Sequence, residues 1–124
     1  MATPMRQAMR LPVGAAFHSR MMEPVQRELA GEMEGLAFTD PRIPMVSNAS
    51  GELVESADAV RQALIDQIAS AVQWVRCVET LRANGVTRFV EVGPGRVLSG
   101  LVRRIDRESE TVAVDSVAKL GELA

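Results

Sequence analysis

The sequence predicts an α/β fold with a short, largely parallel sheet flanked by helices. Apolar runs of strand length alternate along the chain with stretches in which apolar residues recur at helical spacing. Prolines and glycines fall between several of these runs, where turns are expected. The 124 residues fit one domain, and 47% hydrophobic with 24% charged residues is typical of a globular protein. A packed core is therefore expected.

The first elements surround the only histidine, His18, in the segment "VGAAFHSRMMEPV". The run 11–14 is short, apolar and closed by glycine, which predicts a buried strand or the approach to one. His18 would then lie just past a strand end. From Ser19, a predicted N-cap, an apolar stripe predicts a helix that accepts Pro24 near its first turn. The stripe consists of Met22, Val25, Leu29, Met33 and Leu36.

A short strand over 43–47 and a turn over 48–51 are predicted next. The next helix is indicated by a stripe whose one polar member, Gln67, is expected to face inward or to lie on a seam. That stripe consists of Val60, Ala63, Leu64, Gln67, Ile68 and Ala71. A second stripe, 74–81, ends at "NGV", where Gly85 is a suitable helix stop.

The last third reads as strand, turn, helix and strand. "VTRFVEVGPG" predicts a strand running into a glycine-proline-glycine turn, and apolar residues over 97–105 predict the following helix. "TVAVDSV" predicts a final strand before a polar C-terminal helix. Only about four strands are available, and the first begins almost at Met1, so the N-terminal edge of the sheet is expected to be cut.

Composition excludes several functional classes. Fourteen Lys and Arg against sixteen Asp and Glu give a formal charge of −2, which is not typical of a general binder of nucleic acids or anionic membranes. Aromatic residues make up 3%, so base stacking is not expected. The single cysteine, Cys77, excludes an internal disulfide, and Cys and His are too few for structural zinc. We expect Cys77 to be buried and the protein to be cytoplasmic.

Two further features are candidates for chemistry. "EVGPG" before a helix could present backbone amides to a phosphate, or it could be only a tight turn. Arg96, Arg103 and Arg107 fall near one helical face, with Arg104 beside them, which suits either a solvated face or an acidic partner. His18 as a general base would need a proton donor within roughly 3 Å, and no "GxSxG" elbow is present; the alternative is a histidine satisfied in a packed turn.

Four ordered segments together resemble a known family. "LPVGAAFHSRMMEPV", "PRIPMVSNASG", "QIASAVQWVRCVETLRANGV" and "RFVEVGPGRVLSGLVRRI" are similar to the C-terminal part of malonyl-CoA:acyl-carrier-protein transacylase and of related acyltransferase domains in fatty acid and polyketide synthesis. The resemblance implies a partial α/β-hydrolase-like acyltransferase core whose N-terminal half is missing. Residues 1–14 would end the small ferredoxin-like subdomain, and the rest would belong to the large subdomain.

The resemblance also implies roles for single residues. In this family a serine in a "GHSxGE" elbow takes malonyl from coenzyme A and passes it to the phosphopantetheine thiol of acyl carrier protein. His18 matches the histidine that activates this serine, and Gln67 matches the residue whose backbone carbonyl orients the histidine. Phe17 matches a position linked to malonyl selectivity, and Arg103 and Arg104 match a basic pair that binds the carrier protein. "EVGPG" matches a structural turn.

Three functions follow as hypotheses. The first is malonyl transfer by a Ser-His mechanism, in which this chain supplies the histidine, malonyl-CoA is the substrate, and no cofactor is permanently bound. The elbow serine, the oxyanion-hole glutamine and the arginine for the malonyl carboxylate would precede Met1, so the chain alone is expected to be inactive. The second is an inactive fragment that serves carrier-protein docking or assembly. The third is a nucleotide-binding domain that uses "EVGPG". No nucleic-acid or membrane partner is expected.

Overall fold

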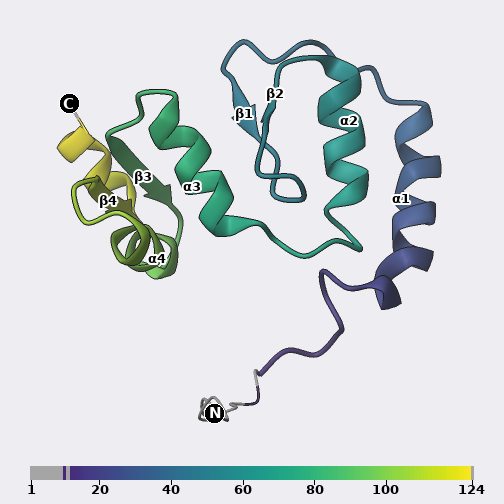
Figure 1. Ribbon diagram of the computed structural model, residues 1–124, viewed down its shortest axis with the longest axis horizontal. Helices are drawn as coiled ribbons and strands as arrows, with labels where there is room; N and C mark the ends of the chain where they lie inside the picture. Colours follow the sequence, from purple (N-terminus) through teal and green to yellow (C-terminus); the bar gives the residue numbers. More distant parts are fainter. Residues whose placement is uncertain (1–9, 11, 124) are drawn as a thin grey trace, which may run out of the picture.

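The described part of the chain is an α/β structure with two small two-stranded sheets (Figure 1). The computed structural model describes residue 10 and residues 12–123. Strands β1 (Met45–Val46) and β2 (Leu53–Val54) are antiparallel, whereas β3 (Arg88–Val92) and β4 (Glu110–Val114) are parallel. The helices are η1 (Arg20–Met22), α1 (Glu23–Glu34), α2 (Ala57–Asp66), α3 (Trp74–Ala83), α4 (Val97–Ile105) and η2 (Val117–Leu123). The predicted class is confirmed, and one of the two sheets is parallel.

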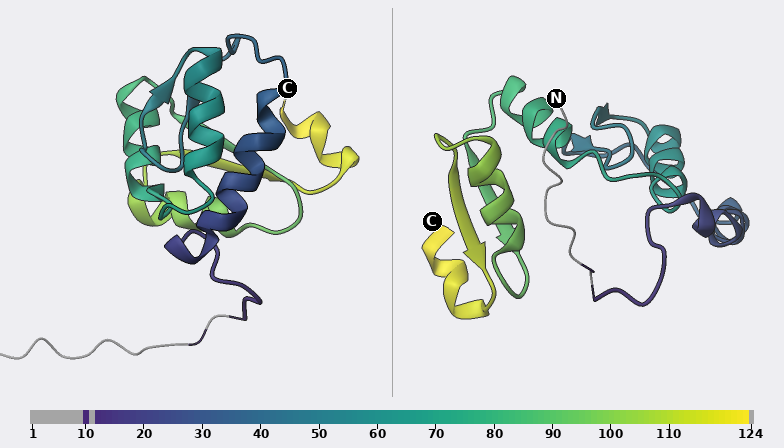
Figure 2. Two further views of the ribbon diagram at one scale, coloured as in Figure 1. Left: turned by 90° about the vertical axis from the view of Figure 1, so that its right-hand side faces the viewer. Right: turned by 60° about the horizontal axis from the view of Figure 1, so that its bottom comes forward.

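Helix α3 connects the two sheets. It contacts β1 on one side and α4 on the other, while α4 packs against both β3 and β4. Helices α1 and α2 pack against each other, and α2 also contacts β2. The right-hand view of Figure 2 shows the same grouping, with α1, α2 and the β1–β2 hairpin on one side of α3 and the parallel pair on the other.

The strand predicted over 11–14 is not formed in the described residues. Residues 12–14 have no regular structure there, and Leu11 lies outside the described residues. A strand needs a hydrogen-bonded neighbour, and neither described sheet reaches this segment. The prediction that His18 follows a strand end is therefore wrong. His18 lies in a turn instead.

Ser19 occupies the predicted N-cap position, but its side chain does not make the capping hydrogen bond. Ser19 is the residue before η1, but its hydroxyl donates to the carbonyl of Ala16 at 2.7 Å and does not cap the helix. The main-chain N–H of Met22 reaches the Ser19 carbonyl at 2.9 Å, which makes a 3-10 turn before α1 begins. Pro24 lies in the first turn of α1, as predicted, because no intrahelical donor is needed there.

Helix α2 ends earlier than its apolar stripe. Ser56 caps its start by accepting from the Ala59 N–H at 3.2 Å, and Gln67 is the C-cap. Ile68 and Ala71 therefore lie beyond the helix, so Gln67 belongs to a helix end rather than to a seam. The polar C-terminal helix is likewise the 3-10 helix η2. Elsewhere the predictions agree closely: α3 stops before Gly85, whose φ of 86° suits glycine.

The turn "EVGPG" is held by a carboxylate. Glu91 accepts hydrogen bonds from the Leu98 N–H at 3.1 Å, the Ser99 N–H at 2.8 Å and the Ser99 hydroxyl at 2.7 Å. Gly93 and Gly95 have φ of 134° and 96°, which side chains rarely allow. The carboxylate occupies the amides that a phosphate would need at the start of α4. The nucleotide-binding hypothesis is therefore wrong for this turn.

The buried core is small. It consists of Met33, Cys77, Val78, Val102 and Val114. Cys77 is buried as predicted, and burial raises the pKa of its thiol. Many apolar side chains stay exposed, among them Met21, Ile43, Val92, Val97 and Val117. No helix within residues 12–123 is long and apolar enough to cross a membrane.

We predict that Glu91→Gln destabilises the chain in a pH-dependent way. The hydrogen bonds from the Ser99 main chain and hydroxyl lower the pKa of Glu91 below its ordinary 4.5. Because the folded-state pKa is lowered, the stabilisation is present above about pH 4.5 and disappears as the pH falls through the folded-state value. The urea midpoints of the wild type and the variant should differ at neutral pH and converge in acid.

Amide exchange at Leu98 and Ser99 gives a local check. Both amides should exchange faster with solvent in Glu91→Gln than in the wild type at neutral pH. Glu55→Gln, which removes an exposed carboxylate from another loop, is the control and should change neither amide. Midpoints that differ equally at neutral and acidic pH would contradict the role of the Glu91 charge.

Candidate active site around His18

The ring of His18 is bound to the end of α2. His18 Nδ1 lies 2.9 Å from the main-chain carbonyl oxygen of Gln67, 49 residues away. This confirms the predicted contact. A carbonyl oxygen only accepts hydrogen bonds, so Nδ1 is the donor and the neutral ring keeps its lone pair on Nε2. The imidazole is thus held in the form that can take a proton at Nε2.

The position of Gln67 at a helix end explains why its carbonyl is available. The last carbonyls of an α-helix have no partner inside the helix. In α2 two of them are reached by side chains from the segment that contains His18 and α1. Gln26 Nε2 donates to the Ile65 carbonyl at 3.1 Å, and His18 donates to Gln67. Gln26 was not a predicted site residue, because a glutamine on a helix gives no distinct sequence signal.

The backbone of His18 is unusual as well. Its φ of 57° is in the left-handed region, and it is the one positive value among the non-glycine residues of the described chain. Such conformations cluster at functional sites, where the surrounding structure holds them. Here the hydrogen bond from the Ser19 hydroxyl to Ala16 spans the turn and the ring contact to Gln67 anchors it. The turn and the helix end together aim the ring.

Several apolar side chains close to His18 in sequence are exposed. His18 itself is exposed, and the exposed fractions are 61% for Val13, 60% for Phe17 and 77% for Met21; we call these three residues the His18 patch. Within the described residues, Nε2 has no hydrogen-bond partner, and the nearest serine in sequence, Ser19, is committed to Ala16. Within the described residues, the contact to Gln67 is therefore the one hydrogen bond of the His18 ring.

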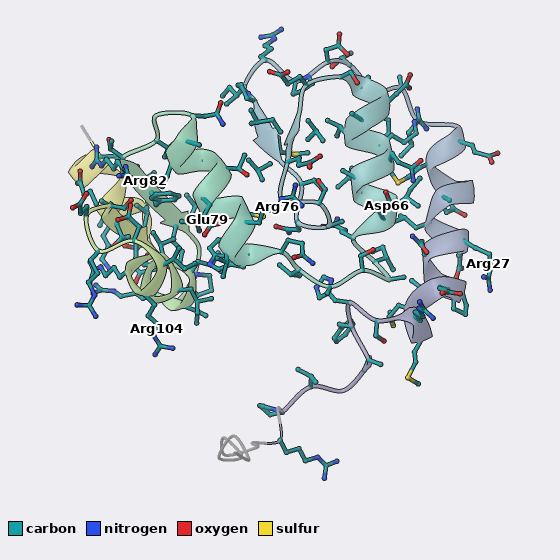
Figure 3. The ribbon with its side chains drawn as sticks, viewed as in Figure 1. Arg27, Asp66, Arg76, Glu79, Arg82 and Arg104 are labelled. Atoms are coloured by element: carbon teal, nitrogen blue, oxygen red, sulfur yellow. The ribbon has the colours of Figure 1, made fainter. Side chains whose placement is uncertain are left out.

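The two arginines of the predicted basic pair have different surroundings in the structure. Arg103 and Arg104 both lie in the last turn of α4. Arg103 Nε donates to the Thr111 hydroxyl at 2.6 Å, so its side chain runs over β4. Arg104 is exposed and points away from the rest of the chain (Figure 3). The structure brings His18 and Gln67 together, whereas the two arginines form a separate feature on α4.

Comparisons with known proteins give the family context. No protein-family model matches the chain. It is 36% identical over 109 residues to the malonyl CoA-acyl carrier protein transacylase of Bacillus subtilis, covering 88% of this chain and 34% of that protein. The crystal structure of an acyl carrier protein S-malonyltransferase from Vibrio cholerae is 39% identical with a TM-score of 0.87, covering 96% and 39% of the two chains.

A third similar structure contains a partner. It is a type II polyketide synthase acyl-carrier protein in complex with its malonyl-transacylase; identity is 38%, the TM-score is 0.83, and coverage is 89% of this chain and 36% of that one.

The chain corresponds to the C-terminal part of malonyl-CoA:acyl-carrier-protein transacylases. The resemblance seen in its sequence is confirmed, and so is the partial acyltransferase fold. The chain spans 34–39% of the length of these similar proteins.

Proposed function

We propose that this chain is the histidine-bearing part of a malonyl-CoA:acyl-carrier-protein transacylase. The observation that carries the proposal is the hydrogen bond between His18 Nδ1 and the Gln67 carbonyl, which leaves Nε2 as the proton acceptor. The similarity to malonyl transacylases supplies the reaction class. The serine comes from the part of these proteins that this chain does not span.

The proposed reaction divides into two transfers. His18 Nε2 takes the proton of the serine hydroxyl, and the serine oxygen attacks the thioester carbonyl of malonyl-CoA. The carbon–sulfur bond breaks, and the imidazolium returns its proton to the departing coenzyme A thiolate. In the second transfer His18 accepts the proton of the carrier thiol, the thiolate takes the malonyl group, and the serine recovers a proton. The Gln67 carbonyl stabilises the imidazolium through Nδ1 in both.

The chain alone is proposed to be inactive. Catalytic groups of this kind act as a unit, and a base without its nucleophile has no acyl group to transfer. The open His18 patch supports the same view, because water competes for an exposed imidazole. A covering part would exclude water from the site.

A second candidate function is docking of an acyl carrier protein by this chain without catalysis. It is favoured by the exposed Arg104 beside Arg103 and by the similar malonyl-transacylase that was solved with its acyl-carrier protein. The two functions are compatible in a whole enzyme. In the isolated chain only docking would remain.

The proposed function predicts the result of a reconstitution. The pure chain incubated with malonyl-CoA should show no malonyl adduct by intact-mass analysis. Adding a separately expressed part with the "GHSxGE" serine should give an adduct on that part, and His18→Ala should remove it because the base is lost. Arg27→Glu, at an exposed position on α1, is the control and should label normally. An adduct on the pure chain would reveal a nucleophile within it and overturn the proposal.

Phe17 is proposed to set the preference for malonyl over methylmalonyl by filling the space beside His18. Phe17→Ser should raise the methylmalonyl rate relative to malonyl in the reconstituted enzyme. A methyl group in a pocket is worth roughly 1 to 3 kcal/mol, so a shift of about tenfold is expected. Met21→Ser, in the same His18 patch, is the matched control. An unchanged ratio in competition assays would assign the preference to the other part.

The docking function predicts a charge effect. Reversal of Arg103 and Arg104 to Glu should weaken carrier-protein binding by about tenfold at low salt, with a smaller effect at high salt because surface charges are screened. Arg27→Glu carries the same change of charge on another surface and should leave the affinity unchanged. Equal weakening by Arg27→Glu would show attraction to overall charge alone.

A further inference from the structure

A pocket of about 280 Å³ beside α4 is lined by three cationic side chains, two from the ends of α4 and one from η2. Arg96 precedes α4, Arg103 lies in its last turn and Lys119 belongs to η2. We call this the α4–β4 pocket. Its remaining lining is Ser99, Gly100, Thr111, Val112 and Ala113. Helix α4 and the C-terminal helix η2 thus bring positive charge to one hollow in a chain whose formal net charge is −2.

Two of the three cations have no counter-ion in the described structure. Lys119 Nζ is paired with Asp115, 2.8 Å from Oδ1, and this contact lowers the pKa of the Asp115 carboxyl. For residues 10 and 12–123, no ion pair involves Arg96 or Arg103. The Glu91 carboxylate lies at the start of α4, but it is committed to the amides of Leu98 and Ser99.

The placement of Arg96 is electrostatically unfavourable by itself. It is the N-cap residue of α4, where the helix dipole is positive and a cation is disfavoured. Arg103 across the pocket adds like charge. In contrast, Arg103 at the C-terminal end of α4 suits the dipole, so helix electrostatics explain one arginine and not the other. An anion between the two guanidinium groups would relieve both repulsions.

Arg103 is also held in place for such a ligand. Its Nε donates to the Thr111 hydroxyl at 2.6 Å, which fixes the side chain and leaves both terminal nitrogens for another acceptor. A side chain that is ordered before binding loses less entropy when a ligand arrives. The planar guanidinium matches two oxygens of one oxyanion.

We propose that the α4–β4 pocket binds a phosphate monoester. Two uncompensated positive charges match a group that carries −1.5 to −2 near neutral pH, whereas a carboxylate or a phosphodiester carries only −1. Under the proposed function, on which the choice of ligand rests, coenzyme A supplies such a group as its ribose phosphate. The phosphopantetheine of a carrier protein is a diester and fits the charge of the pocket less well.

Inorganic phosphate tests the pocket without any assumption about the reaction. Titration of the 124-residue chain at constant ionic strength, followed by amide NMR, should give saturable shifts in 96–103 and 111–113. Arg96→Gln and Arg103→Gln should each weaken binding about fivefold. Arg107→Gln removes a charge outside the pocket and should have less than about a twofold effect. Shifts that do not saturate, or equal weakening by Arg107→Gln, would overturn the proposal.

Coenzyme A analogues then test the source of the phosphate. Coenzyme A should displace inorganic phosphate at lower concentration than the analogue without the ribose phosphate, and Arg96→Gln should remove the difference. Equal displacement of phosphate by the two compounds, or no displacement by either, would overturn the assignment to coenzyme A. If holo carrier protein displaced phosphate more strongly than apo carrier protein, the pocket would belong to the carrier's phosphopantetheine instead. Saturable phosphate binding with a failed reconstitution would sink the proposed transacylase function and leave the pocket standing.

Discussion

The hydrogen bond from His18 to the end of α2 is the constraint on which the site depends. It joins two segments 49 residues apart, and it uses a carbonyl that exists because a helix ends at that point. Any residue type would supply the same carbonyl, so Gln67 acts through its place in the helix rather than its side chain. The ring orientation, the tautomer and the left-handed backbone of His18 all follow from this attachment.

Side chains also form hydrogen bonds with the main chain at other helix ends. Arg61 donates to the carbonyls of Met33 in the last turn of α1 and of Leu36 just after the helix, and its guanidinium lies 4.5 Å from the centre of the Phe38 ring. Glu91 closes the start of α4. Net contributions of about 0.5–1.5 kcal/mol are typical of such hydrogen bonds, so these contacts to helix termini add to the packing that holds the segments together. The site therefore uses a device that the fold uses generally.

Local pattern predicted the local structure well and the non-local contacts poorly. Residues 97–105 carry enough periodicity to give α4 at its observed bounds, and Gly85 marks the end of α3. The apolar stripe through Ile68 and Ala71 continues past the end of α2. Apolar periodicity shows which face of a helix is buried, but it does not show where the helix ends. The strand at 11–14 depends on a neighbour that local pattern does not contain. The contact of His18 with Gln67 was predicted only through the family resemblance. That Lys119 lines the same pocket as Arg96 was visible only in the structure.

Under the proposed function, the exposed apolar surface near His18 would connect assembly with catalysis. Val13, Phe17 and Met21 lie close to His18 in sequence, and each exposes more than half of its surface. Apolar patches of this kind are characteristic of interfaces, and their burial contributes roughly 25 cal/mol per Å². A part that covers the His18 patch would gain affinity from these side chains. It would also remove water from Nε2 and bring its own groups to the ring. Under the proposed function, the interactions that hold the two parts together and those that make His18 an effective base therefore involve the same surface.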